Sequence, residues 1–187
     1  MIYYISDLHF GHRNVLEMDG RPFETIEDMD EILIRLWNER VTEEDDVYIV
    51  GDFAYHNGYT ATWYLRRLKG RKHLIIGNHD RHTLQDAKAM EYFFSVEKMV
   101  RVMDNGRTVS LCHFPVAEWN GKRYGGYHVH GHIHVRRDEV YEFMVYEPNV
   151  HVSIAGLPGM EDHTITCSSL SKTSQQPCVR WFCVSLS

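Results

Sequence analysis

The sequence has 187 residues, of which 43% are hydrophobic and 25% charged, and a formal net charge of −6 at pH 7. This length and composition fit one globular domain with its own core, and the acidic balance argues against stable binding of duplex DNA. No segment resembles a membrane span or a secretory signal. The four cysteines include no Cys-x-x-Cys pair, so we expect free thiols in a reducing cytoplasm and a cytoplasmic protein.

Short apolar runs in the first half of the chain predict buried strands. They cover residues 2–5, 47–50 and 73–76. A capping-box pattern at Thr25–Asp28 and an apolar stripe at helical spacing from Met29 to Trp37 predict a helix between the first two strands. Further helices are expected near residues 60–68 and 83–93. This alternation of strand and helix predicts a parallel sheet with helical crossovers.

The pattern changes after residue 95. Asn105-Gly106 lies between two strand-like runs, residues 99–103 and 108–112, and favours a tight hairpin. Further strands are expected at residues 127–130 and 140–146. The second half of the domain is therefore predicted to be antiparallel.

Polar clusters rich in Asp, Asn and His stand where apolar runs stop. In chain order they are Asp7-Leu8-His9, Gly51-Asp52, Gly77-Asn78-His79-Asp80, Cys112-His113 and Gly131-His132-Ile133-His134. Because ligands bind at the carboxyl ends of strands in open α/β sheets, we expect these clusters to meet at one site. Turn chemistry explains an isolated Asp or Asn but not the His residues. Asp, Asn and His bind hard to borderline divalent metals, so the joint pattern predicts a two-metal hydrolytic site.

Two adjacent cations need different donors. Ions about 3.5–4 Å apart can hold both the attacking and the leaving oxygen of a phosphoryl centre. Asp52 is the candidate carboxylate between them, Asn78 offers a neutral oxygen, and four imidazoles complete the ligand set. His132 and His134 point to opposite sides of an extended segment, so each could serve one ion. A hydroxide bridging the two ions would attack phosphorus in line.

This series of motifs resembles the calcineurin-like metallophosphoesterase superfamily, and within it the small single-domain bacterial and phage members. Gly11-His12, Arg21-Pro22-Phe23 and His113-Phe114-Pro115 are similar to further features of those members. The resemblance covers roughly residues 1–152. It implies an α/β (α+β) fold over a domain of residues 1–155, a β-sandwich of two mixed sheets flanked by helices.

The resemblance also implies a role for each matched residue. One ion would be bound by Asp7, His9, Asp52 and His134, and the second by Asp52, Asn78, His113 and His132. His79 would be a catalytic residue that hydrogen-bonds the phosphate and assists the leaving group, and Asp80 would orient it. The implied cofactors are two divalent ions among Mn, Fe, Zn and Ni.

Four further residues are candidate substrate contacts. His12 and His56 closely follow metal clusters, and Arg13 and Arg21 carry guanidinium groups that match phosphate oxygens. The alternative for the His residues is a supporting contact to the metal ligands, and for the Arg residues a solvated surface charge.

The sequence thus predicts a metal-dependent hydrolase of a small phosphodiester substrate, nucleotides included. Phosphomonoester hydrolysis is the alternative reaction. A non-catalytic binding scaffold on the same fold is the alternative from another class, and the complete ligand set weighs against it. The acidic balance weighs against a nuclease that acts on DNA ends.

Residues 156–187 differ in amino-acid composition from the rest of the chain. They are rich in Ser and Thr and hold three of the four cysteines. The irregular spacing of His163, Cys167, Cys178 and Cys183 argues against a zinc cluster. Two hypotheses for this atypical tail are an out-of-frame translation and a late replacement of the original terminus. Residues 179–184 are the best candidate for an edge strand, and part of the tail is expected to be disordered.

Overall fold

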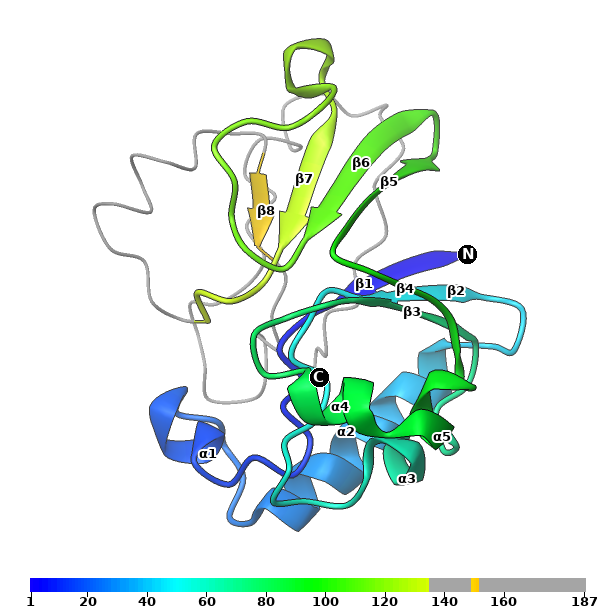
Figure 1. The fold of residues 1–187 in the computed structure, drawn as a ribbon. Helices are drawn as coiled ribbons and strands as arrows, with labels where there is room; N and C mark the ends of the chain where they lie inside the picture. Colours follow the sequence, from blue (N-terminus) through cyan, green and yellow to red (C-terminus); the bar gives the residue numbers. More distant parts are fainter. Residues whose placement is uncertain (135–148, 152–187) are drawn as a thin grey trace.

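Two four-stranded sheets and a layer of helices form the part of the chain that the computed structural model describes, residues 1–134 and the backbone of 149–151 (Figure 1). The predicted strand at 140–146, the predicted domain end at 155 and the tail lie outside these residues. The described architecture is mixed α/β.

The first sheet is parallel throughout, as predicted. Its order is β1 (Ile2–Ile5), β2 (Asp46–Ile49), β3 (Arg71–Ile75) and β4 (Phe93–Glu97). Successive side chains in β1 face opposite sides, because strand residues alternate between the two faces of a sheet. Tyr3 and Ile5 belong to the core beneath the helices, whereas Tyr4 belongs to the core between the two sheets. The sheet is therefore covered on both faces.

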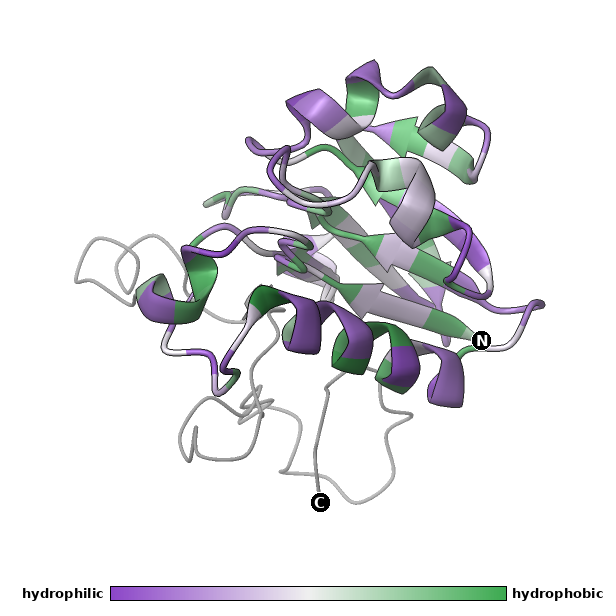
Figure 2. Cartoon of the chain, turned by 90° about the horizontal axis from the view of Figure 1, so that it is seen from below, coloured by the Kyte–Doolittle hydropathy of each residue, from purple (hydrophilic) through white to green (hydrophobic). Residues whose placement is uncertain are grey.

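The helices lie on one face of the first sheet (Figure 1). They are α1 (Val15–Met18), α2 (Ile26–Arg40), α3 (Ala61–Leu65), α4 (Arg81–Gln85) and α5 (Ala87–Met90). The predicted start of α2 is confirmed, since Thr25 Oγ1 accepts a hydrogen bond of 3.1 Å from the backbone N–H of Asp28. Hydrophobic and hydrophilic residues alternate along this long helix (Figure 2), and its buried side includes Met29, Leu33 and Trp37.

The prediction of one helix over residues 83–93 was wrong. Asp86 ends α4 and caps α5, because its side chain accepts a hydrogen bond from the backbone N–H of Ala89. Phe93 then begins β4. The longest helix of the described chain, α2, has 15 residues, and none of the helices found there could cross a bilayer.

The second sheet has the order β5 (Met99–Asp104), β6 (Arg107–Cys112), β7 (Tyr127–His130) and β8 (Asn149–His151). The predicted hairpin between β5 and β6 is confirmed, with φ of 49° at Asn105 and 76° at Gly106. The expectation of a fully antiparallel second half was wrong, because β6, β7 and β8 pair in parallel. The connection that includes the 3₁₀ turn η1 (Lys122–Tyr124) returns the chain to the starting end of the sheet before β7.

Candidate metal centre

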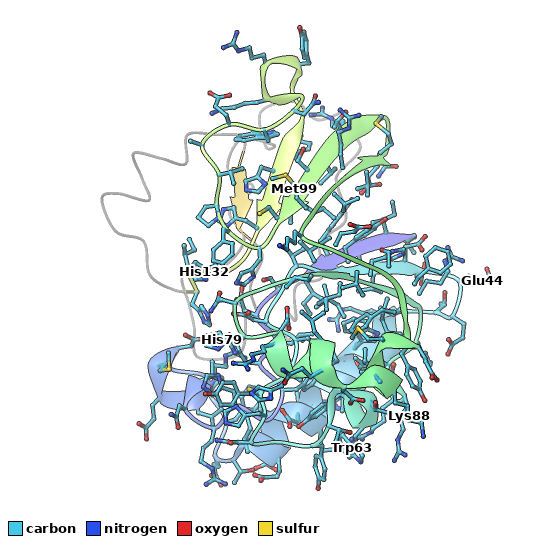
Figure 3. All side chains as sticks on the ribbon, in the orientation of Figure 1. Glu44, Trp63, His79, Lys88, Met99 and His132 are labelled. Atoms are coloured by element: carbon cyan, nitrogen blue, oxygen red, sulfur yellow. The ribbon has the colours of Figure 1, made fainter. Side chains whose placement is uncertain are left out.

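The candidate ligands lie at the carboxyl ends of strands from both sheets. Asp7, Asp52 and Asn78 follow β1, β2 and β3, whereas His113 follows β6 and His132 and His134 follow β7. Figure 3 labels His79 and His132 at the end of the molecule where the loops of the two sheets meet. The structure therefore brings the candidate ligands together, although they are spread over more than one hundred residues of sequence.

Most of these ligands adopt a backbone conformation that residues with a side chain usually avoid. Asp7, His9, Asp52, His132 and His134 have φ between 50° and 72°. In the described ranges Asn105 of the hairpin is the only other non-glycine residue with a positive φ. Such left-handed residues cost roughly 1–3 kcal/mol each and cluster at functional sites, where surrounding contacts enforce them. The loops are thus held in a strained shape that turns these side chains toward one another.

The first donor cluster consists of Asp7, His9, Asp52 and His134. One ligand atom from each of these four residues lies within 4.8 Å of the other three. His9 Nε2 is 3.2 Å from His134 Nε2 and 3.6 Å from Asp52 Oδ2, and His134 Nε2 is 3.6 Å from Asp7 Oδ1. These are the residues that the family resemblance assigns to one ion.

The second donor cluster adjoins the first through Asp52. Asn78 Oδ1 lies 2.9 Å from His113 Nε2 and 2.8 Å from His132 Nδ1. His113 Nε2 is in turn 3.4 Å from Asp52 Oδ2. The four residues assigned to the second ion are therefore joined in a row of contacts, from Asp52 through His113 and Asn78 to His132.

Asp52 provides the test of whether a cation fits here. Its Oδ1 accepts a hydrogen bond of 2.8 Å from the backbone N–H of His79, but its Oδ2 is buried without a hydrogen-bond partner among the described residues. A buried carboxylate oxygen is costly unless a donor or a cation compensates it. Its neighbours are the imidazoles of His9 and His113, one from each donor cluster. Asp52 Oδ2 thus lies where a bound cation would compensate it.

The imidazoles are oriented through their far ring nitrogens. His113 Nδ1 lies 2.9 Å from the Val50 carbonyl oxygen, His134 Nδ1 lies 2.8 Å from Asp19 Oδ2, and His9 Nδ1 lies 3.1 Å from His12 Nδ1. Metal-binding histidines are commonly held in this way, because donation from one nitrogen leaves the lone pair of the other for the metal. In all three rings Nε2 is the nitrogen that faces the donor clusters.

The charge states also suit a cation. Burial, reinforced by the charge of Arg21, lowers the pKa of His9 to about 2, so this imidazole is neutral at pH 7. Burial opposes a charge on His113 as well, but the nearby Asp52 carboxylate raises the pKa of His113 to about 9. The Asp52 carboxylate therefore favours positive charge beside it.

Glycines in the motifs permit the close approach of the loops. A Cβ at Gly131 would collide with Ser6 and Asp7, and a Cβ at Gly77 would collide with the Asp52 carboxylate. Any side chain at either position would push apart the segments that carry the donors.

Arg21 is a correction to the sequence analysis, which made it a candidate substrate contact. It is only 6% exposed, and its guanidinium donates to the backbone oxygens of Asp7 and Leu8 at 2.8 and 3.1 Å and to Asp19 Oδ2 at 3.0 Å. Arg21 is therefore a positioning residue for the Asp7 loop. Asp19, which links Arg21 to His134, was missed, because an acidic residue after a short helix carries no sequence signal of its own.

Replacement of Arg21 by Lys is expected to lower the affinity for metal by about 10–100-fold, the usual effect of losing an outer contact to metal ligands. A lysine keeps the charge but cannot donate to two carbonyl oxygens and Asp19 together. Titration calorimetry with Mn²⁺ would measure the change. Arg35→Lys is the matched control, since Arg35 pairs with Glu39 on the exposed side of α2. Equal Mn²⁺ affinity in Arg21→Lys and wild-type protein would refute the positioning role.

Asp80 is a second correction. It was expected to orient His79, but its carboxylate accepts hydrogen bonds from the backbone N–H groups of Gly77, Asp52 and Phe53 at 2.7, 3.0 and 2.8 Å. In the described part of the chain none of its hydrogen bonds goes to the His79 ring. The side chain is fully buried, and turning inward lets one carboxylate satisfy three N–H groups. Asp80 therefore holds the loop that contains Asp52 next to the loop that contains Asn78 through hydrogen bonds to both.

His79 and His12 lie beside the first donor cluster. The His79 ring is half-buried, 5.4 Å from the His9 ring and 6.0 Å from the His12 ring. Its nitrogens make no hydrogen bond within residues 1–134. His12 is buried and stacks on Tyr55 at 4.0 Å, and it contacts His9 through Nδ1. His12 thus supports a candidate ligand, whereas His79 keeps its nitrogens available.

The other two candidate substrate contacts lie farther out. Arg13 is exposed and lies 3.9 Å from Glu27. His56 is exposed and packs between Tyr55 and His82, with ring centroids 4.3 and 4.7 Å away. Neither side chain contacts a candidate ligand among the described residues.

No family model matches the chain. The uncharacterized protein MJ1445 of Methanocaldococcus jannaschii is 32% identical over 145 residues, which cover 76% of this chain and 74% of that protein. The gene 66 protein of Mycobacterium phage D29 is 34% identical over 163 residues, which cover 72% of this chain and 79% of that protein. The crystal structure of AQ665, a protein of unknown function from Aquifex aeolicus, is similar with a TM-score of 0.64 at 24% identity, over 82% of this chain and 90% of that one.

The likeness to AQ665 concerns the fold alone. The two sequence relatives are similar over most of their own length and of this chain. The chain therefore belongs to the protein family that includes MJ1445 and the gene 66 protein of phage D29.

Proposed function

We propose that the protein is a phosphoesterase that uses two divalent metal ions, of the calcineurin-like type that its motifs resemble. The observation that carries the proposal is the unpartnered Asp52 Oδ2 between two donor clusters. Both clusters mix nitrogen and oxygen donors, which suit borderline ions such as Mn, Fe, Zn or Ni. Asp7, His9 and His134 would hold one ion, Asn78, His113 and His132 the other, and Asp52 both.

The bound ions and the side chains of the protein would contribute different parts of the reaction. When bound, the ions would polarise the phosphoryl oxygens and lower the pKa of water at the site. The strained loops hold the donors in place before the substrate arrives, so little reorganisation is needed. His79, beside His9 and with free ring nitrogens, would donate a proton to the leaving oxygen so that it departs as an alcohol.

A phosphodiester is favoured over a monoester because neither candidate guanidinium within residues 1–134 is placed to bind a phosphate. The guanidinium of Arg21 is occupied by backbone oxygens and Asp19, and Arg13 is exposed beside Glu27. A dianionic monoester would benefit from such a cation more than a monoanionic diester does. Monoester hydrolysis remains the alternative reaction, to be compared directly.

Removal of metal is expected to abolish the reaction and its return to restore it. Protein dialysed against a chelator should not hydrolyse bis(4-nitrophenyl) phosphate, and addition of Mn²⁺ should restore hydrolysis as binding reaches two ions per chain by elemental analysis. The monoester 4-nitrophenyl phosphate should react more slowly. Activity that survives complete chelation would overturn the proposal. Failure to bind metal at stoichiometric supply would instead favour a non-catalytic scaffold.

A further inference from the structure

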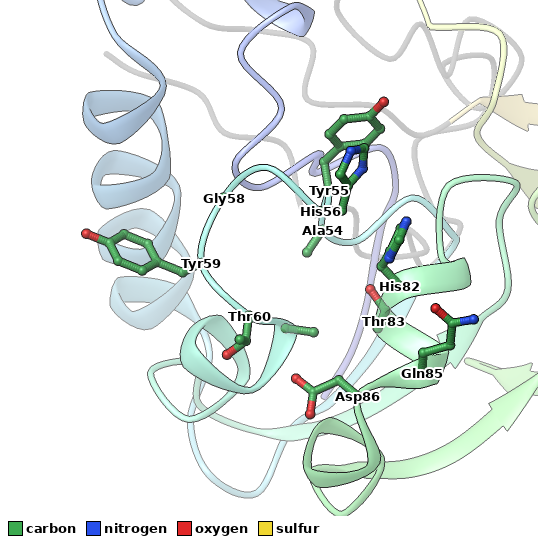
Figure 4. Close-up of a pocket in the computed structure, with 11 residues that line it drawn as sticks. Ala54, Tyr55, His56, Gly58, Tyr59, Thr60, His82, Thr83, Gln85 and Asp86 are labelled. Carbon is green, nitrogen blue, oxygen red and sulfur yellow. The ribbon is translucent and has the colours of Figure 1, made fainter.

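A cavity of about 290 Å³ lies beside the metal centre, between the loop that follows Asp52 and α4 (Figure 4). Tyr55 and His56 come from the loop, and His82 and Thr83 come from α4. Sites for small molecules usually have volumes of about 300–1,000 Å³, so this cavity is just below that range. It can accept one ring system rather than a whole dinucleotide.

Thr83 gives the cavity an unused hydrogen-bonding group. Its side chain is only 1% exposed, and its Oγ1 has no hydrogen-bond partner among the described residues. Figure 4 shows this oxygen directed from α4 toward the loop on the other side of the cavity. A hydroxyl can both donate and accept, so a ligand with either group on its edge would satisfy it.

The other walls favour a flat and uncharged ligand. Aromatic rings line the upper part, where His56 lies 4.3 Å from Tyr55 and 4.7 Å from His82 between ring centroids. The described residues that line the cavity include no Lys or Arg, and the carboxylate of Asp86 is among them. An anionic group such as a second phosphate would therefore be poorly stabilised there.

The cavity shares a wall with the candidate metal centre. The Tyr55 ring stacks on His12, which contacts the candidate ligand His9, and its centroid lies 5.9 Å from that of His79. Only the Tyr55 ring would thus separate a group bound in the cavity from His79, the proposed proton donor to the leaving oxygen.

We propose that this cavity binds a neutral heteroaromatic ring of the nucleobase kind, carried by one arm of the phosphodiester. The inference rests on the proposed function for the position of the phosphate, and on the cavity itself for the ring. The Tyr55, His56 and His82 rings contact the faces or edges of the ligand, and Thr83 hydrogen-bonds a polar atom on its edge.

Binding of adenosine, cytidine and uridine to the metal-free protein tests the proposal without any catalysis. By ligand-observed NMR, we expect at least one of these nucleosides to bind at least tenfold more tightly than ribose. Thr83→Val should weaken that binding at least fivefold while leaving the melting temperature unchanged or higher, because the lost hydroxyl has no partner in the free protein. Thr108→Val on β6 is the matched control and should bind as wild type does. His82→Ala, at an exposed position, provides a second variant expected to weaken binding.

Nucleosides that bind no better than ribose, or bind Thr83→Val as tightly as wild type, would overturn the proposal. Competition by inorganic phosphate for the cavity would overturn it as well. Metal-dependent hydrolysis of bis(4-nitrophenyl) phosphate without nucleoside binding would refute the cavity alone. Thr83-dependent nucleoside binding in a protein that hydrolyses no phosphoester would support the cavity and refute the proposed function.

Discussion

Asp52→Asn protein is expected to lose metal-dependent phosphodiester hydrolysis, with kcat lowered at least about 10³-fold. Polarisation of phosphoryl oxygen by bound metal is worth several kcal/mol, and each 1.36 kcal/mol corresponds to a factor of ten in rate. An amide has nearly the same size as the carboxylate but no charge to offset the repulsion of two adjacent cations. It would also direct either an N–H group or a weaker oxygen donor at His9 and His113.

The measurement is kcat for bis(4-nitrophenyl) phosphate together with metal content by elemental analysis. Asp46→Asn is the matched control, because Asp46 begins the same strand at its opposite end and pairs with Arg71 on the surface. This control should keep both activity and metal. Full activity with two bound ions in Asp52→Asn protein would refute the assignment of Asp52 as a ligand of both ions.

His79→Ala is expected to lower kcat by about 10²–10⁴-fold, the usual contribution of a positioned general acid. Unlike loss of a ligand, the change should leave two ions per chain, because the His79 ring contacts the first donor cluster without belonging to it. The combination of lost activity and retained metal distinguishes a proton donor from a ligand.

A series of leaving groups provides the internal control for His79. Diesters with an acidic phenol need little protonation as the bond breaks, whereas diesters of simple alcohols need much more. The loss in His79→Ala should therefore be larger for alkyl than for nitrophenyl leaving groups. An equal loss for both, or a loss of bound metal, would contradict the assignment.

The parts of the fold that local sequence determines were predictable. The cap at Thr25, the Asn105-Gly106 hairpin and the first three strands of the first sheet each depend on a few neighbouring residues, whereas its fourth strand, β4, was not predicted. The division of the predicted helix at Asp86 depends instead on a side chain that also binds Thr62, 24 residues away. The parallel pairing of β6 with β7 depends on the path of a long connection, which no local pattern describes.

The same distinction applies to the site. The convergence of Asp and His at strand ends follows from the general rule for α/β sheets, whereas the division of these residues into two donor clusters was implied by the family resemblance. The places of Arg21 and Asp80 could not, since both side chains bind backbone groups of other loops. A charged residue near a ligand motif looks the same in the sequence whether it faces substrate or the protein interior.

The left-handed conformations of five candidate ligands have a consequence for the evolution of this chain. At each of these positions the left-handed backbone itself would cost about 1–2 kcal/mol less with glycine. A ligand that binds only the folded state returns stability in proportion to its occupancy. Bound ions would therefore offset the backbone cost of Asp and His at these positions. In a descendant that no longer encounters metal, the loops would drift toward glycine and lose the site before they lose the fold.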